Sequence, residues 1–196
     1  MKERGILMSG MNIPPIQADI KTHTRRIMNP QPIYETTSQG IEWFRYKGQG
    51  FTAKGMNMYL KSRYGQPGDR LWVKETWAHH VQAIGAKRYE DGPFVYAADG
   101  EFAEQYRIDG KWKPAIFMPR WASRILLEIT EIRVERLQDI SEADAIAEDA
   151  VPSIVGTDLD YLKFRAGYHS LWETINGSGS WSENPFVWVI IFRRIK

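Results

Sequence analysis

The clearest pattern of apolar and polar positions lies in the second half of the chain. Apolar residues recur at every second position over 125–129 and continue at 132 and 134 in the opposite phase. Such a change of phase is typical of a strand that bends or bulges, here near Thr130. The unbroken apolar run 186–192 predicts another strand, buried on both faces.

Two helices are predicted between these strands. Ser141 is a good N-cap, and the acidic residues that follow it favour the helix dipole, so a short helix should extend to about Glu148. Apolar and aromatic residues then recur at helical spacing over 161–175. An Asn-Gly pair at 176–177 should end this second helix.

The first half of the chain contains shorter signals. Residues 5–8 predict a strand, and the proline pair at 14–15 is suited to the first turn of a short helix. The threonine-rich residues 21–26 alternate as a strand does. A Gln-Pro-Gly-Asp turn precedes a further predicted strand over 70–73.

These elements predict an α+β fold. Short strands surround two helices without regular alternation of strand and helix, which favours a small mixed β-barrel flanked by short helices over a doubly wound sheet. Residues 33–64 and 79–113 have weak periodicity and are interpreted as two insertions. A length of 196 residues, 43% of them hydrophobic, suits one domain with insertions or at most two small ones, and we expect a single domain over 1–196.

Composition removes several classes of protein. The absence of cysteine excludes disulfides, thiolate zinc sites, iron–sulfur clusters and a cysteine nucleophile. The longest apolar run has seven residues, whereas a membrane span needs about 20. The basic N-terminus is followed by two prolines rather than by a signal-peptide core. A cytoplasmic protein that does not contact a membrane and needs no cofactor is therefore expected.

Charge is divided unevenly along the chain. Residues 1–74 carry 12 Lys and Arg against 5 Asp and Glu, whereas 75–196 carry 14 against 19, for a net charge of +2. A basic half that is rich in aromatic residues suits contact with a phosphate backbone and stacking on bases. Pairing between the two halves within the fold explains the same asymmetry, so charge permits a nucleic-acid partner without requiring one.

The first candidate for chemistry is the run Lys21-Thr22-His23-Thr24-Arg25-Arg26. Lysine acts as a nucleophile or base only after losing its proton, and burial or neighbouring cations favour that loss. The alternative is an exposed basic strand that contacts phosphate or nothing. In an ideal strand the side chains at 21 and 24 point to opposite faces, so a shared site needs a turn or bulge between them.

The second candidate is the acidic helix that contains Glu142, Asp144, Glu148 and Asp149. Such a run usually forms a solvated face, and a functional role needs one carboxylate that points inward. Glu148, which follows several alanines, is the best placed to do so.

A metal site is a weaker possibility. Glu75 and His79 have the four-residue spacing of ligands on one helix face, and His80 follows directly. No cysteine and no further clustered histidine completes a set of ligands. We therefore expect no metal site.

Taken together, these pieces resemble the ASCH superfamily, a group of PUA-like β-barrel proteins. Residues 119–124, Pro-Arg-Trp-Ala-Ser-Arg, resemble the longer ASCH form that is common in bacteriophages and prophages. The resemblance covers somewhat more than half the chain and leaves the two insertions outside the minimal barrel. Four segments carry it: the N-terminal strand and helix that lead into Lys21-Thr-His-Thr-Arg-Arg26, Gly68-Asp-Arg-Leu-Trp-Val-Lys-Glu75, the strands over 123–136 that lead to Leu137-Gln-Asp-Ile-Ser-Glu142, and the terminal strand 186–195.

The resemblance implies a nucleoside or nucleic-acid ligand. Small bacterial members are amidohydrolases that remove the acetyl group of N(4)-acetylcytidine, using a lysine, a threonine and a glutamate. By motif these catalytic positions fall on Lys21, Thr24 and Glu148, with Glu142 as the alternative glutamate. The remaining motif residues would bind substrate or phosphate, namely Thr22, Arg25 and Arg26. The chain departs from the family before the lysine, where Asp19-Ile20 replaces a small residue and glycine.

Two other functions remain open at this point. A non-catalytic RNA- or DNA-binding module would use Lys21, Arg25 and Arg26 as phosphate contacts and aromatic residues as stacking platforms. A ribonuclease would use the same basic surface. The expected partner is accordingly a modified nucleoside, RNA or DNA.

Overall fold

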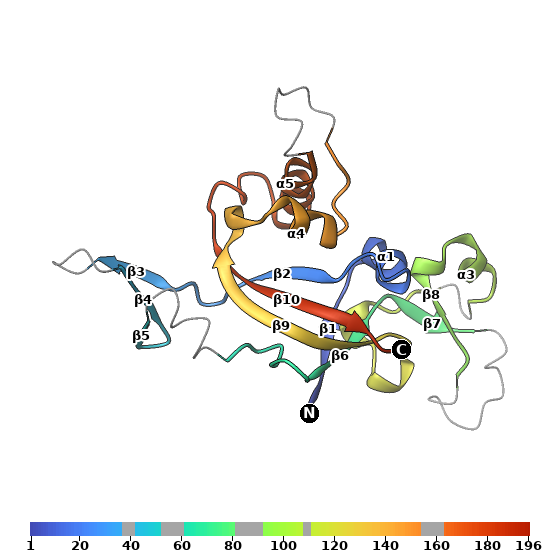
Figure 1. Cartoon of the computed structure of the whole chain (residues 1–196). Coiled ribbons are helices and arrows are strands. Elements are labelled where there is room, and N and C mark those ends of the chain that lie inside the picture. The colour runs from blue at the N-terminus through green and yellow to red at the C-terminus, as the bar shows by residue number, and fades with distance from the viewer. Residues whose placement is uncertain (37–41, 52–60, 81–91, 108–110, 154–162) are drawn as a thin grey trace. The chain divides into compact units, whose positions relative to one another are not determined.

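The computed structural model describes residues 1–36, 42–51, 61–80, 92–107, 111–153 and 163–196 (Figure 1). It confirms a mixed α+β protein with a five-stranded mixed sheet and short helices, in the strand order β1-β6-β9-β10-β2. The strands β1 (Glu3–Leu7) and β6 (Arg70–Lys74) are parallel. The pair β6 and β9 (Leu126–Arg136) and the pair β10 (Phe186–Arg194) and β2 (His23–Ile27) are antiparallel.

The chain divides into two compact units, each built from segments that are distant in sequence. Unit 1 comprises Met1–Ile20, Gly68–Ile129 and Arg193–Lys196, and unit 2 comprises Lys21–Pro67 and Thr130–Phe192. Both units therefore contain part of β9 and part of β10.

Unit 1 is built on β1 and β6, whose buried residues include Ile6, Leu71 and Val73. Its remaining elements are short. They are η1 (Gly10–Asn12), α1 (Ile13–Gln17), β7 (Trp77–His79), β8 (Phe94–Tyr96), η4 (Ala97–Asp99), α3 (Glu101–Gln105), η6 (Ala115–Phe117) and η7 (Arg120–Ala122). The proline pair lies in the first turn of α1, as expected. A backbone N–H in the first turn has no partner within the helix, so proline, which lacks this N–H, loses no hydrogen bond there.

Unit 2 packs its helices around an apolar cluster. The elements outside the five-stranded sheet are β3 (Ile33–Thr36), β4 (Glu42–Tyr46), β5 (Gln49–Phe51), η8 (Leu137–Asp139), α4 (Glu142–Ala147) and α5 (Lys163–Asn176). Tyr168 and Trp172 of α5 pack with Ala145 of α4 and with Val187 and Val189 of β10. Burial of aromatic and β-branched side chains of this size is the main contribution to the stability of such a cluster.

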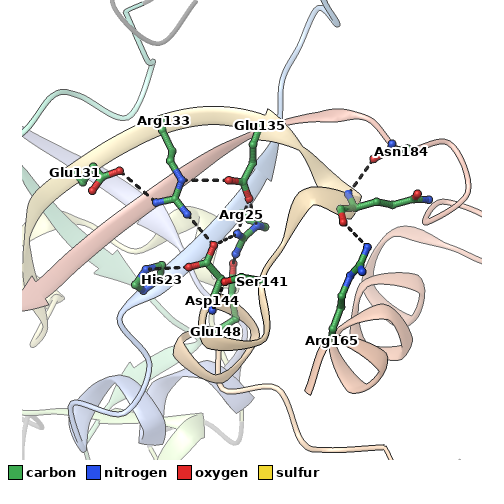
Figure 2. A network of polar contacts seen from close by, with 11 residues as sticks. His23, Arg25, Glu131, Arg133, Glu135, Ser141, Asp144, Glu148, Arg165 and Asn184 are labelled. Carbon is green, nitrogen blue, oxygen red and sulfur yellow. Dashed lines mark hydrogen bonds and ion pairs between the residues drawn. The ribbon is translucent and has the colours of Figure 1, made fainter. Parts of the chain in front are cut away.

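Polar contacts complete the packing of α5 in unit 2. The Arg165 guanidinium donates to the carbonyl oxygen of Gln138, whose own N–H donates to Asn184 Oδ1 at 2.9 Å (Figure 2). The start of α5 is thereby tied to η8, the turn that leads into α4.

Most of the elements expected from the sequence are confirmed, with small shifts at their ends. Ser141 caps α4, its hydroxyl accepting from the N–H of Asp144 at 3.0 Å. The slip in apolar phase is real, since Thr130 and Glu131 are both exposed, but β9 continues through it as one strand. The second helix ends at Asn176 as predicted, before Gly177 with its positive φ of 100°.

The two predicted insertions contain more structure than their weak periodicity indicates. Residues 33–51 include the antiparallel sheet β3-β4-β5, and residues 79–113 include β8 and α3. Each strand of that small sheet is only three to five residues long, so no alternation could develop along it. Parts of both insertions, at 37–41, 52–60, 81–91 and 108–110, lie outside the described residues.

Among the helices that the structure describes, none combines the length and the apolar character needed to cross a bilayer.

Candidate functional site

Lys21 and Glu148 meet in unit 2 although 127 positions separate them in the chain. The Lys21 ammonium donates to Glu148 Oε2 at 2.8 Å and to the Glu148 carbonyl oxygen at 2.6 Å. Both residues are buried, with exposed fractions of 3% and 4%. The adjacent backbone fixes their approach, because the N–H of Thr22 donates to the carbonyl oxygen of Ala147 at 2.9 Å.

Arg25 brings three carboxylates together. Its guanidinium is fully buried and contacts Glu148 Oε1 at 3.3 Å, Asp144 Oδ2 at 2.7 Å and Glu135 Oε1 at 2.5 Å (Figure 2). The planar guanidinium has five N–H donors, which suits it to several acceptors at once. Arg25 of β2 therefore links β9, which carries Glu135, to α4 and the residue after it.

Arg133 extends the network toward solvent. It donates to Glu135 Oε2 at 3.1 Å and to Asp144 Oδ2 at 2.7 Å, and it is more exposed than Arg25 (Figure 2). Three cations thus face three carboxylates that are largely shielded from water, and Arg133 also contacts the exposed Glu131 at 3.2 Å. A buried charge without a partner is costly, so this balance is what allows the group to stay inside unit 2.

The charges around Glu148 keep it ionised. Burial raises the pKa of Glu148, but the charges of Lys21 and Arg25 outweigh burial, and Arg26 adds to their effect, so the pKa lies below its ordinary value. Both oxygens of this carboxylate are engaged, Oε2 by Lys21 and Oε1 by Arg25. Glu148 therefore acts as a fixed negative charge beside the lysine.

His23 lies at the edge of the same network. Its Nδ1 is 2.9 Å from Thr22 Oγ1, and its Nε2 is 3.8 Å from Asp144 Oδ1. Burial lowers the pKa of His23 and outweighs the opposite effect of Asp144 and Glu148. The ring is therefore neutral at neutral pH.

The two phases of β2 separate the predicted site residues. Lys21 precedes the strand, and its ammonium contacts Glu148 at the end of α4. His23 and Arg25 also contact carboxylates of this region. Thr24 and Arg26 alternate with these residues, so their side chains belong to the other face of β2. In the antiparallel register they pair with Ile190 and Trp188 of β10. The structure thus brings Lys21, Arg25 and Glu148 into contact, while Thr24 is buried in the other phase of the strand.

Glu142, the alternative glutamate, has a different place. Its carboxylate accepts from the backbone N–H groups of Phe164 and Arg165, both at 3.0 Å. Unpaired N–H groups at the start of a helix favour such an acceptor, so Glu142 caps α5. Glu148 is the glutamate that faces Lys21.

Three members of the network, His23, Arg133 and Glu135, were not among the site residues expected from the sequence. Asp144 was noted only as part of the acidic helix, although its spacing of four from Glu148 places both on one face. Arg133 and Glu135 share one face of β9, and this alternation of charges was the signal available for them. His23 lies in the first candidate run but has no role in the resemblance, although strand alternation places it on the same face as Lys21 and Arg25.

No metal site accompanies these groups in the parts of the chain that the structure describes, where no three His, Asp or Glu side chains are placed to hold an ion. Glu75 of unit 1 instead accepts from Arg124 through both oxygens, at 3.0 Å each. His79 packs its ring against Trp77 and Phe94.

Comparison of the chain with protein-family models, with curated proteins and with solved structures gives no match.

Replacement of Arg25 should destabilise the protein strongly. Arg25→Met leaves three carboxylates near one another without their shared cation, and breaking a buried ion pair in this way costs about 3–5 kcal/mol. The control is Arg193→Met, which removes an exposed pair with Glu128 and should cost less than about 1 kcal/mol. Urea unfolding measures both, and an Arg25→Met free energy of unfolding equal to that of the control would contradict the prediction.

Acid should weaken the fold through the same carboxylates. Burial raises the pKa of Asp144, but Arg25 and Arg133 outweigh burial, so its pKa is lowered like that of Glu148. A carboxyl group with a lowered folded-state pKa stabilises the fold above its unfolded-state pKa, and this contribution disappears as the pH falls through the folded-state value.

The free energy of unfolding should therefore decline from about pH 5 downward. Asp144→Asn and Glu148→Gln should each make that decline shallower in urea titrations at several pH values. A decline of unchanged slope in both variants would show that these groups do not titrate as described.

Proposed function

We propose that unit 2 carries a hydrolase site that cleaves the exocyclic amide of an acylated nucleoside similar to N(4)-acetylcytidine. The observation that carries this proposal is the buried contact between Lys21 and Glu148 at 2.8 Å. These two residues occupy the positions to which the ASCH resemblance assigns its catalytic lysine and glutamate. A PUA-like barrel is the finer description of the fold that we propose on the same ground, and the mixed sheet with short helices is compatible with it.

Lys21 is proposed to stabilise the oxyanion that forms when the amide carbonyl is attacked. In the described part of the chain, two of its three N–H donors go to Glu148. The third is available for the substrate oxygen, and a fixed cation in a site with little water is effective at this task. Glu148 holds the ammonium in place through its own contact with Lys21, and Arg25 fixes Glu148 from the other side.

The other motif residues have secondary roles in this proposal. Arg25 supports Glu148, because its guanidinium is already surrounded by carboxylates. Thr24 and Arg26 enter on the strength of the resemblance alone, Thr24 as a catalytic residue and Arg26 as a substrate contact, on the other phase of β2.

Removal of the Lys21 ammonium should abolish the activity while a surface lysine is dispensable. The substrate is N(4)-acetylcytidine, and chromatography measures the cytidine that forms. Lys21→Ala should lose at least about a hundredfold in rate, as is common when one oxyanion donor is removed. Lys61→Ala, which alters an exposed lysine of the same unit, should retain the wild-type rate. Lys21→Arg keeps the charge and reports whether charge alone is enough.

Urea unfolding of each variant separates loss of the fold from loss of chemistry. If the folded wild-type protein leaves the nucleoside intact, or if Lys21→Ala is as active as Lys61→Ala, the proposal is wrong.

A second candidate function, binding of single-stranded RNA or DNA, rests on a segment of unit 1. Residues 111–121 contain three cations and no acidic residue, and they expose Phe117 and Trp121. Exposed aromatic rings among cations are the typical platform on which bases of a single strand stack.

If this candidate is right, Phe117→Ala should weaken the binding of an oligonucleotide by about tenfold, as loss of one stacking ring does. Phe102→Ala is the matched control, because Phe102 is also well exposed, at 64% against 74% for Phe117, but lies on α3 beside Glu101 and Glu104. Fluorescence anisotropy at increasing salt measures both, and affinity should fall steeply with salt. Equal affinities for the two variants would exclude stacking on Phe117.

A further inference from the structure

The proposed hydrolase site needs a group that moves a proton, and Lys21 and Glu148 do not supply it. Cleavage of an amide requires removal of a proton from the nucleophile and delivery of one to the departing amine. The Lys21 ammonium is engaged by Glu148, and both Glu148 oxygens already accept from cations. Lowering of the pKa of Glu148 makes it a weaker base still.

His23 has the properties that the pair lacks. The ring lies beside the network, within reach of the charges of Asp144 and Glu148 at α4, of Arg133 on β9 and of Arg25 on its own strand. It is partly exposed, as is Thr22, whereas Lys21 and Glu148 are buried. Thr22 and His23 are therefore the more accessible members of the site.

The surroundings of the two ring nitrogens differ, and they favour one tautomer of His23. Asp144 Oδ1 faces Nε2, while Asp144 Oδ2 is occupied by Arg25 and Arg133 (Figure 2). We assign the tautomer with the proton on Nε2, which faces this carboxylate at 3.8 Å, so that the lone pair of Nδ1 accepts from the Thr22 hydroxyl at 2.9 Å. A hydroxyl, a neutral imidazole and a carboxylate stand in the order that nucleophilic catalysis uses.

We propose that Thr22 and His23 form the proton-transfer pair of this site, with the Thr22 hydroxyl as nucleophile and His23 as its general base. This inference rests on the proposed amide hydrolysis and assigns residues to steps that Lys21 and Glu148 leave open.

The reaction divides into two balanced steps. Thr22 Oγ attacks the acyl carbon as His23 Nδ1 takes the hydroxyl proton, and Lys21 stabilises the oxyanion. The C–N bond then breaks, the amine leaves with the proton from His23, and an acyl ester remains on Thr22. Water, deprotonated by His23, attacks this ester, and the acid leaves as the proton returns to Thr22. Asp144 stabilises the imidazolium in both steps.

Trapping of the acyl ester tests the pair without relying on the nucleoside substrate. The protein is exposed briefly to p-nitrophenyl acetate, quenched in acid, digested with trypsin and analysed by mass spectrometry. Trypsin cuts after Lys21 and separates Thr22 from it, whereas acetylation of Lys21 blocks this cut. An ester on Thr22 is also released by hydroxylamine, and an amide on lysine is not.

We expect one acetyl group on the peptide that begins with Thr22. It should be absent in Thr22→Val, at least a hundredfold slower to form in His23→Gln, and unchanged in Thr174→Val, which removes an exposed hydroxyl of α5. The acid limb of the pH dependence of kcat/KM should have its midpoint below the ordinary pKa of histidine. This limb should be absent from His23→Gln.

The outcomes separate this inference from the proposed function. Turnover of N(4)-acetylcytidine with acetyl on Lys21, or with an unchanged pH profile in His23→Gln, overturns the Thr22–His23 pair and leaves the hydrolase proposal standing. Acetyl on Thr22 without turnover of the nucleoside supports the pair and overturns the proposal that an acylated nucleoside is the substrate. If the protein shows no acetyl transfer to Thr22 and no turnover of the nucleoside, both the pair and the proposed function are overturned.

Discussion

The buried guanidinium of Arg25 is the interaction on which the arrangement of unit 2 depends. It contacts carboxylates from β9, from α4 and from the residue that follows α4, and so it fixes where each of these elements approaches β2. An arginine without access to water has to find acceptors inside the protein, and the acceptors in turn need a cation. Each charged member of the cluster therefore constrains the positions of the others.

This mutual constraint gives the proposed site its division of labour. Lys21 and Glu148 are fixed in place, because Arg25 holds the carboxylate from its other side. A preorganised pair of this kind suits stabilisation of charge rather than proton exchange. The adjacent His23 is less buried and neutral, so the group that moves protons and the groups that bind charge are distinct residues of one cluster.

The sequence alone predicted the regular elements of unit 2 well, because their signals are local. The Ser141 cap, the end of α5 at Asn176 and the buried strand 186–192 each follow from a few neighbouring residues. The contacts of Arg25 with Glu135 and Glu148 could not be predicted in this way, since they join residues more than 100 positions apart. Glu148 was reached from its place among the alanines and from the resemblance, whereas the role of His23 emerges only from its contacts in the structure.

The most direct test of the central claim is a crystal structure of the Thr22→Val variant with N(4)-acetylcytidine bound. This account predicts that the acetyl oxygen lies within hydrogen-bond distance of Lys21 Nζ and that the acetyl carbon faces residue 22. A nucleoside bound away from Lys21, or no binding by a correctly folded protein, would contradict the claim that the Lys21–Glu148 pair is the centre of a deacylating site.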